Sequence, residues 1–302
     1  MHRTGYCCIN LSIGDKFKTM KLGWAEKNRA AVDAKWEGIV KHNFNLLEKI
    51  IRWNMGNNIF LYRISSDLIP FADHDDFGSL WRNSLANGWA SDASEGVRLA
   101  LKTYLSMGGR ITIHPGQFVS LGSLNPETRR KSMANLEYHG QLLTLLGLPE
   151  NYNCPINIHV SNGTRPNEII DNVKESITYM SESVTRRLVF ENEQNGHWTP
   201  INLRNSFPNI PITFDYHHYS LNPDPEVSMN EAVEFTSKTW PNMDPVQHYS
   251  EGRSSPKDPA HSDFIETLPA SDYDIEVEAK MKDLSIMSFL NNRNPFVTSV
   301  LY

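Results

Sequence analysis

Short apolar runs alternate with longer amphipathic segments along the whole chain. Several of the short runs are β-branched and apolar on both faces, which is typical of buried parallel strands. This pattern predicts strands at His2–Cys8, Ile59–Ile64, Arg110–His114, Pro155–Val160, Arg187–Glu191, Ile212–Asp215, Pro245–Tyr249 and Asp274–Glu278.

Helical periodicity fills most of the intervals between these runs. Apolar residues recur at helical spacing from Trp36 onward, and Gly56 follows where that helix should end. Asn125 is a typical N-cap before a proline and a glutamate, so a second helix should run from there to Gly147. Further helices are expected at roughly Glu95–Ser106, Pro166–Ser183 and Asn230–Ser237, and after Lys280. The polar stretches Leu11–Asp33 and Ser250–Asp263 are predicted to be long loops.

Eight strands alternating with helices favour the α/β class, as a (β/α)₈ TIM barrel with a closed parallel sheet. The 302 residues suit one such barrel, so we expect a single domain over residues 1–302. In this fold the active site lies at the C-terminal ends of the strands.

Metal-capable side chains end six successive predicted strands. Parallel strands in a barrel would bring these side chains together on one face. The six are His114, His159, Glu191, Asp215, His248 and Glu278, and His74, His218 and His261 lie just beyond strand ends. A mixed set of nine ligands suits two or three divalent ions, with Mn²⁺ preferred and Zn²⁺ or Mg²⁺ as alternatives.

Clusters of two or three ions typically serve phosphate-ester hydrolysis. The sequence therefore predicts a phosphodiester hydrolase in which Glu191, Asp215 and Glu278 are the catalytic carboxylates. Glu191 stands in the middle of the series and is the natural bridging ligand. His217, next to His218, is expected to pack or to support a ligand.

Charge and cysteine content refine this picture. The net charge of −6 lacks the basic excess of a non-specific nucleic-acid binder, although bound ions would offset it locally. Three cysteines favour a reduced, intracellular setting. No run of about 18 apolar residues occurs, so no membrane association is expected. We expect a cytoplasmic protein.

Eight segments, in order, resemble the ultraviolet damage endonucleases and cover nearly the whole chain. They read RTGYCCINLS, YRISSDLIPFADH, ITIHPGQFVSLGS, INIHVSNG, LVFENEQ, FDYHHYSLNP, HYSEGRSSPKDPAHSDF and IEVEAKMKD. The resemblance implies a monomeric enzyme that nicks UV-damaged double-stranded DNA immediately 5′ to a cyclobutane dimer or a 6–4 photoproduct.

The resemblance also implies roles for particular residues. One ion would lie on His114, His159 and Glu191, with His74 close by. A second would lie on Glu191, Asp215, His248 and Glu278, and a third on His218 and His261. Tyr6 and Asn10 would line the damage pocket, and Gln117 and Phe118 would probe the duplex. Phosphate contacts are predicted at Arg253, Lys257 and Lys280.

The chain departs from the family pattern at the third ion. Many relatives carry a lysine two residues before the equivalent of His248, where this chain has Val246. Asp258 or Asp263 would have to replace that ligand, or the third ion would bind weakly. Three alternatives stay open: an abasic-site endonuclease of the endonuclease IV type, a sugar isomerase on the same barrel, and an inactive DNA-binding protein.

Overall fold

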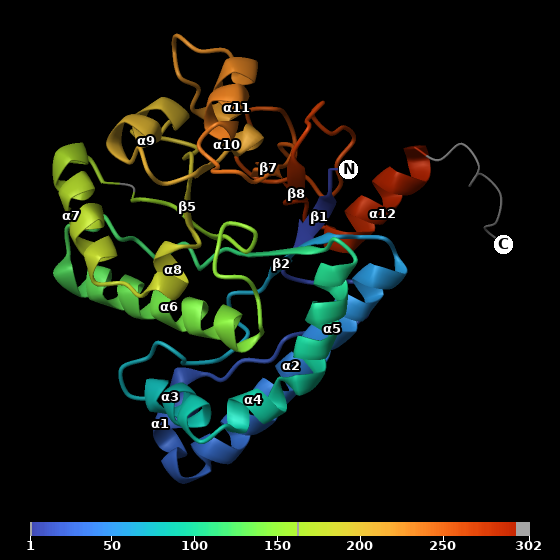
Figure 1. Ribbon diagram of the computed structural model, residues 1–302, viewed down its shortest axis with the longest axis vertical. Coiled ribbons are helices and arrows are strands. Elements are labelled where there is room, and N and C mark those ends of the chain that lie inside the picture. The colour runs from blue at the N-terminus through green and yellow to red at the C-terminus, as the bar shows by residue number, and fades with distance from the viewer. Residues whose placement is uncertain (1, 162, 294–302) are drawn as a thin grey trace.

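The structure, a computed structural model, describes residues 2–161 and 163–293. Its eight strands form one parallel sheet in the order β6-β5-β4-β3-β2-β1-β8-β7 (Figure 1). The strands are β1 (Thr4–Cys7), β2 (Leu61–Ile64), β3 (Arg110–Ile113), β4 (Ile156–Ile158), β5 (Leu188–Glu191), β6 (Ile212–Thr213), β7 (Val246–Tyr249) and β8 (Asp274–Val277). All eight predicted strands are confirmed, each shorter than expected.

The sheet nearly closes on itself between β6 and β7. An isolated parallel bridge joins Asp215 to His248, and the His248 amide donates to the Phe214 carbonyl at 2.9 Å. The predicted TIM barrel is therefore confirmed. At Gly5 on β1 an added Cβ would overlap the backbone carbonyl of Leu61, so the approach of β1 to β2 requires glycine.

Helices surround the barrel and connect most of its strands. They are α1 (Leu22–Lys27), η1 (Arg29–Ala31), α2 (Val32–Gly56), α3 (Gly78–Ala86), α4 (Trp89–Ala93), α5 (Glu95–Ser106), α6 (Pro126–Leu145), α7 (Pro166–Thr178), α8 (Glu182–Thr185), α9 (Pro200–Ser206), α10 (Tyr216–Leu221), α11 (Met229–Ser237) and α12 (Lys282–Arg293). Asn125 caps α6 as predicted, its side chain accepting from the amide of Glu127 at 2.9 Å.

Two sequence predictions about the connections were wrong. The stretch Leu11–Asp33 is not one loop, because it contains α1, η1 and the start of α2. Its lysines are exposed: Lys16 and Lys18 precede α1, and Lys21 and Lys27 stand at the two ends of that helix. The predicted helix Pro166–Ser183 is two helices, since α7 ends before Tyr179 and α8 begins at Glu182. The connection from β7 to β8 carries no helix in the described chain, which agrees with the predicted loop there.

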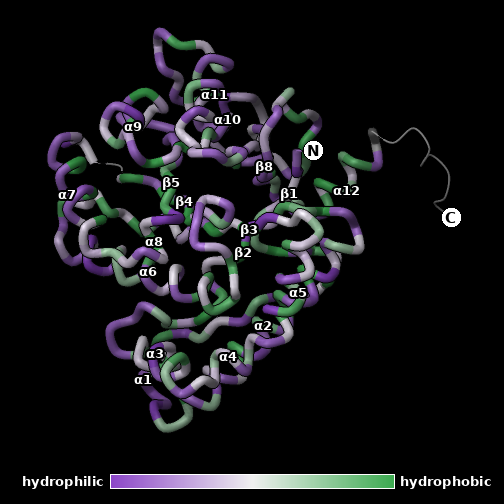
Figure 2. The backbone as a smooth tube through the Cα atoms, in the orientation of Figure 1, coloured by the Kyte–Doolittle hydropathy of each residue, from purple (hydrophilic) through white to green (hydrophobic). Residues whose placement is uncertain are grey.

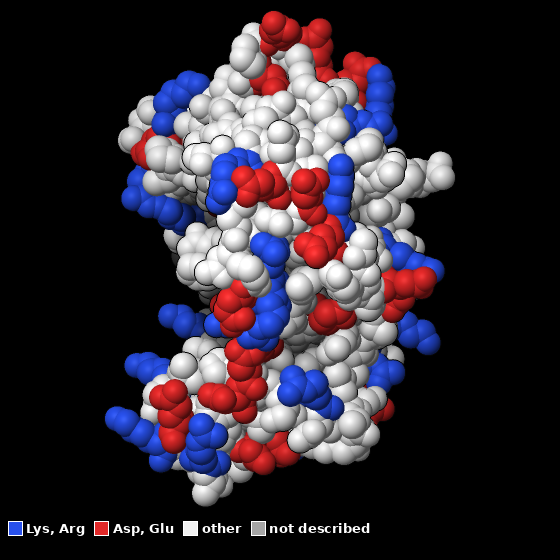
Figure 3. All heavy atoms as spheres, turned by 90° about the vertical axis from the view of Figure 1, so that its left-hand side faces the viewer, with Lys and Arg blue, Asp and Glu red and all other residues white. Residues whose placement is uncertain are grey.

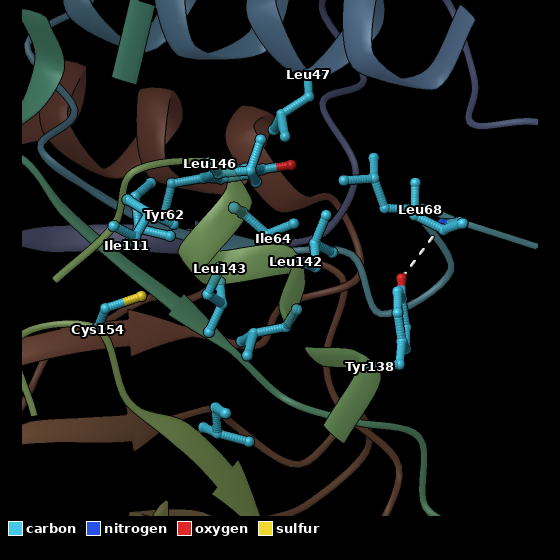
Figure 4. Packing of buried hydrophobic residues seen from close by; sticks show 14 of the residues in the cluster. Leu47, Tyr62, Ile64, Leu68, Ile111, Tyr138, Leu142, Leu143, Leu146 and Cys154 are labelled. Atoms are coloured by element: carbon cyan, nitrogen blue, oxygen red, sulfur yellow. Dashed lines mark hydrogen bonds between the residues drawn. The ribbon is translucent and has the colours of Figure 1, made fainter. Parts of the chain in front are cut away.

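The apolar core lies between the sheet and its helices, and Figure 2 shows apolar residues along the strands. Tyr62 and Ile64 of β2 point outward from the barrel and pack with Leu142 of α6 in the same cluster (Figure 4). Tyr138 of α6 also contacts the connection between β2 and α3, where its hydroxyl accepts a hydrogen bond from the amide of Ile69 at 3.3 Å. Such packing holds the strand ends in fixed positions.

Ion pairs occupy much of the barrel interior, where many TIM barrels have layers of apolar side chains. Arg110 of β3 is fully buried and its Nη1 lies 2.9 Å from Asp274 Oδ2 on β8. Arg3 reaches the same carboxylate at 2.7 Å. Two residues further along these strands, Thr112 donates to Glu276, which is also buried. These buried ion pairs form a polar layer inside the barrel, beneath the candidate site.

The lengths and polarity of the helices bear on the prediction that the chain does not associate with a membrane. Among the described residues, every helix is too short or too polar to cross a lipid bilayer.

Candidate metal centre

Seven predicted ligands meet at the C-terminal ends of the strands, as the sequence predicted. Three groups each place their ligand atoms within 4.8 Å of one another. They are His114, His159 and Glu191; Glu191, Asp215 and His218; and Asp215, His248 and Glu278. Each could hold a divalent ion, because histidine nitrogens and carboxylate oxygens are the usual ligands of Zn²⁺ and Mn²⁺.

Glu191 lies at the centre of the groups. Its Oε2 is 3.2 Å from His114 Nε2 and 3.0 Å from His248 Nδ1. Its Oε1 is 3.2 Å from His218 Nδ1. The carboxylate is 1% exposed and also receives a hydrogen bond from the amide of Asn157 on β4. Ligands from the end of β3, from β7 and from α10 (Tyr216–Leu221) therefore face this one carboxylate, which two of the three groups share.

In the group of Asp215, His248 and Glu278, two buried ligand atoms have no hydrogen-bond partner among the described residues. These are Asp215 Oδ2 and His248 Nδ1, in residues 0% and 2% exposed. A buried polar atom without a partner costs free energy unless some other group satisfies it. Both atoms belong to the same three-residue group, so the donor set fits a divalent cation there.

Backbone carbonyls orient three of the histidines. The Nδ1 atoms of His114, His218 and His261 lie 2.9, 2.9 and 2.8 Å from the carbonyls of Pro115, Asn192 and Glu278. A carbonyl accepts only, so each Nδ1 carries the proton. Each Nε2 is then free to bind a metal, an arrangement common for histidine ligands.

The sequence analysis missed three buried charged residues of the site. Glu193 Oε1 is 3.1 Å from His159 Nδ1. Arg63 of β2 pairs with Glu276 at 2.7 Å and with Glu278 at 2.6 Å. A signal existed for Glu276, because it lies two residues before Glu278 in the predicted strand Asp274–Glu278 and so shares its face. Glu193 lies beyond the end of β5, so strand alternation did not predict its position. Arg63 sits inside an apolar run that gave no such signal.

His74 and His261 join none of the three groups in the described chain. His74 lies between Phe71 and Phe77, with ring centroids 5.5 Å from each, and its Nδ1 accepts from the amide of Asp76. His261 Nδ1 is 3.8 Å from Glu278 Oε2, and its ring faces His217 at 5.6 Å. The predicted placement of His74 near the first ion is not seen in this structure.

Neither candidate replacement for the family lysine reaches the third position. Val246 is buried against Val189 and Trp240. Both oxygens of Asp258 accept from their own loop, from Ser254 and from the amide of Ala260. Asp263 is exposed. Among the described residues His218 groups with Glu191 and Asp215, and His261 joins no group, so a third ion on these two histidines stays a prediction.

The predicted DNA contacts fall into two sets. Phe118 is 84% exposed, and Gln117 lines a cavity of about 350 Å³ with His114, His159 and Glu191. Arg253 lines a larger cleft of about 990 Å³ beside the site, and Lys257 donates to the carbonyl of Ser220. These residues lie where a bound strand could reach them.

The other set is buried, contrary to the prediction of direct DNA contact. Tyr6 is 0% exposed, and its hydroxyl donates to Asn54 at 2.7 Å and accepts from Asn10 at 2.8 Å. Asn10 is 2% exposed but borders a cavity of about 360 Å³. The Nζ of Lys280 is buried without a hydrogen-bond partner in the described chain. Tyr6 thus supports Asn10 from beneath instead of lining an open pocket.

Electrostatics in the site favour the ionised form of Glu191 and the protonated forms of His218 and His248. Burial would raise the pKa of Glu191, but the histidines around it, His248 and His159 foremost, hold that pKa well below the usual value. Burial would lower the pKa of His218 and of His248. Asp215 instead raises that of His218 to about 11, and Glu191 raises that of His248 to about 10. Burial raises the pKa of Asp215.

These pKa directions predict proton release when a metal binds. A histidine binds metal only in its neutral form, so the metal-free protein must lose protons from His218 or His248 near pH 7.5. We expect the Mn²⁺ affinity to rise with pH, roughly tenfold per unit for each proton released. Calorimetric titrations in two buffers of different ionisation enthalpy measure the number released. Equal observed enthalpies in the two buffers would contradict the prediction.

The fold and the site together define a TIM-barrel protein with a candidate metal centre at the C-terminal face of its strands. The chain belongs to the UV-endonuclease UvdE family, whose profile matches residues 2–298. Similarity to curated and solved relatives extends over most of the chain.

Three curated relatives illustrate this. The "UV-damage endonuclease" of Neurospora crassa is 32% identical over 263 residues, which are 80% of this chain and 39% of the relative. The "UV DNA damage endonuclease" of Clostridium perfringens is 29% identical over 85% of this chain and 64% of its own length. The Nostoc protein of the same name is 29% identical over 93% of this chain and 87% of its own. The chain thus spans less than two thirds of the first two relatives.

Solved structures agree with the fold. The crystal structure of SacUVDE superposes with a TM-score of 0.82 at 28% identity, covering 97% of this chain and 98% of the other. Endonuclease IV from Thermus thermophilus shares the fold, with a TM-score of 0.56 at 15% identity over 81% of this chain and 93% of its own.

Proposed function

We propose that this chain is a metal-dependent DNA repair endonuclease that nicks the backbone immediately 5′ to cyclobutane pyrimidine dimers and 6–4 photoproducts. The observation that carries the proposal is the position of Glu191, whose carboxylate faces His114, His218 and His248 at the C-terminal face of the barrel. Membership of the UV-endonuclease family selects damaged DNA as the substrate among the phosphate esters that such a site could cleave.

The centre would hold two or three divalent ions, with Mn²⁺ as the preferred metal and Zn²⁺ or Mg²⁺ as alternatives. Glu191 would bridge a position on His114 and His159 and a position on Asp215, His248 and Glu278. A third ion would bind weakly at His218 and His261, because these two histidines share no group in the described chain. Bound divalent ions supply Lewis-acid stabilisation of the oxygens that gain charge as a phosphodiester breaks.

The remaining site residues would position the substrate. Gln117 borders the ligands and Phe118 projects from the loop beside them, so both would meet the duplex at the lesion. Arg253 and Lys257 would contact phosphates. Basic and acidic side chains are interspersed on the face in Figure 3, so specific contacts near the site, more than a broad basic surface there, would hold the DNA. We propose that one chain acts alone, inside the cell.

A duplex with one cyclobutane dimer and a 5′ end label tests the proposal. The protein is incubated with it in Mn²⁺ or in EDTA, beside undamaged and abasic duplexes of the same sequence. We expect a Mn²⁺-dependent nick at the phosphodiester immediately 5′ to the dimer, leaving a 3′-hydroxyl. The undamaged duplex should stay intact. Cutting of the abasic duplex alone would replace the proposal by an abasic-site endonuclease, and no cutting of any duplex would refute nuclease activity.

Phe118 should contribute to lesion discrimination. Stacking of a base on an aromatic side chain is worth roughly 1–3 kcal/mol, so Phe118→Ala should weaken binding of the damaged duplex by roughly 5- to 150-fold. Binding of undamaged duplex should change much less, because an intact stack offers no exposed base. Fluorescence anisotropy with the two duplexes in EDTA measures both without cleavage.

Tyr179 provides the matched control for Phe118. It is 72% exposed and lies at the C-terminal end of α7, a helix on the connection that returns the chain from the C-terminal end of β4 to the start of β5. Tyr179→Ala should therefore leave both affinities unchanged. Equal losses in the two variants, or a Phe118→Ala loss shared by undamaged DNA, would rule out a lesion-specific role.

A further inference from the structure

We propose that Ile9 and Leu11, on the turn that follows β1, form an apolar wedge that enters the base stack of DNA beside the lesion. This role rests on the proposed function and adds a specificity element to it, separate from Phe118. Three observations carry it: the exposure of the two side chains, the hydrogen bonds that fix their turn, and the position of the turn beside the candidate metal centre.

Exposed large apolar side chains concentrate on loops at the face of the barrel that carries the candidate site. Of the nine such residues in the described chain, four lie on loops that directly follow strand ends. They are Ile9 and Leu11 after β1, Phe118 after β3 and Phe264 after β7. Ile9 is 42% exposed and Leu11 is 37% exposed. Apolar groups that gather beside a functional site typically mark a binding surface.

The turn lies at the rim of the candidate metal centre. Cys8, directly before Ile9, borders the same cavity of about 350 Å³ as Gln117 and the central ligand Glu191. Ile9 and Leu11 border the cavity of about 360 Å³ on the other side of the turn. A DNA strand whose phosphodiester reached the ligands would therefore pass within reach of both side chains.

Hydrogen bonds hold the turn in place. Asp283, which is 0% exposed in the first turn of α12, accepts from the amide of Leu11 at 2.5 Å. It also accepts from the amide of Ser12 at 3.0 Å and from the Ser12 hydroxyl at 2.6 Å. The amide of Cys8 donates to the carbonyl of Arg63 at 2.9 Å. A side chain can part stacked bases only if its own backbone does not yield, and these contacts supply that support.

The chemistry of the two side chains selects the bases as their target. Neutral apolar groups add nothing to phosphate binding, whereas leucine and isoleucine are among the side chains that proteins insert between base steps. Insertion costs stacking free energy, and the cost is smaller where a lesion already weakens stacking and pairing. Burial of the apolar side chains in the opened step offsets that cost. The wedge would therefore favour damaged over intact duplex.

The test compares the wild type with the double variant Ile9→Ala/Leu11→Ala on a dimer duplex that carries 2-aminopurine beside the dimer. This base fluoresces more strongly when it is unstacked, and EDTA prevents cutting. The double variant should bind the dimer duplex roughly 10- to 100-fold more weakly, because two apolar side chains lose their burial. At saturation it should also show little of the fluorescence rise that the wild type causes. Its affinity for undamaged duplex should hardly change.

Two further variants and one further duplex serve as controls. The exchanged pair Ile9→Leu/Leu11→Ile keeps the apolar surface and should retain the wild-type affinity and fluorescence. Leu99→Ala removes a side chain that is 60% exposed on α5 and should change neither property. In a dimer duplex with mismatched bases opposite the lesion, the stack is already weakened. The deficit of the double variant should be smaller on that duplex.

Equal affinities of the double variant and the wild type for the dimer duplex would overturn the inference. So would an equal loss with undamaged duplex or in Leu99→Ala, or a weaker affinity with an undiminished fluorescence rise. If the wild type prefers the dimer duplex in EDTA yet cuts no duplex in Mn²⁺, the proposed cutting is refuted, while a lesion-specific loss in the double variant still supports the wedge. A wild type without preference for the dimer duplex would refute both.

Discussion

Glu191→Gln should lower the rate of nicking beside a single photoproduct by roughly 10³-fold or more at saturating Mn²⁺. A bridging carboxylate contributes to both ion positions, and metal ions supply several kcal/mol of transition-state stabilisation. Each 1.36 kcal/mol is about a factor of ten in rate, so losing about 4 kcal/mol gives this magnitude. Single-turnover nicking of the end-labelled dimer duplex measures the effect directly.

The protein should remain folded in this variant, because glutamine keeps the volume of Glu191 and an oxygen to accept from Asn157. Glu182→Gln is a suitable control, since that side chain is exposed on α8 and pairs with Arg186. It should nick at the wild-type rate. Retention of more than a tenth of wild-type activity in Glu191→Gln would refute the bridging role.

Arg110→Met should lower the free energy of unfolding of the metal-free protein by about 3–5 kcal/mol. Arg110 is 0% exposed and donates to Asp274 and to the carbonyls of Asp244 and Tyr152. Methionine fills similar space but satisfies none of these acceptors. The loss follows mainly from leaving buried oxygens without a donor, since an intact buried pair adds little net stability over a well-packed apolar replacement.

Urea unfolding followed by tryptophan fluorescence measures this change. Arg130→Met is the matched control, because Arg130 also pairs with two carboxylates, Asp75 and Glu127, but on the exposed face of α6. We expect no measurable shift of its unfolding midpoint, as is usual for surface ion pairs. Similar midpoints for both variants and the wild type would show that the stability of the barrel does not depend on the buried pair.

The fold and six of the nine candidate ligands could be predicted because one simple rule relates sequence to position. A parallel strand that ends in His, Asp or Glu places that side chain at the C-terminal rim, whatever lies elsewhere. His114, Glu191 and His248 follow this rule. His74 and His261 lie on loops, whose paths depend on local packing that periodicity does not encode. Phe71 and Phe77, for example, take up the His74 ring.

The charged residues inside the barrel were also not predicted from the sequence. Arg63 and Arg110 occupy strand positions that an apolar pattern would assign to aliphatic residues, and their partners lie more than 150 positions away on β8. A buried arginine is informative only with its carboxylate, and a single sequence does not pair residues so distant. Tyr6 was misplaced for a related reason, because its hydroxyl is satisfied by Asn54 of α2, far along the chain.

The seam of the barrel lies at the candidate site itself. Asp215 and His248, which stand in one ligand group, also form the bridge between β6 and β7. The same two residues therefore close the sheet and form part of the ligand group, so an ion bound there would stabilise the closed barrel. Saturation with a divalent ion should slow amide hydrogen exchange at His248, whose amide spans the seam, more than exchange on the far side of the barrel.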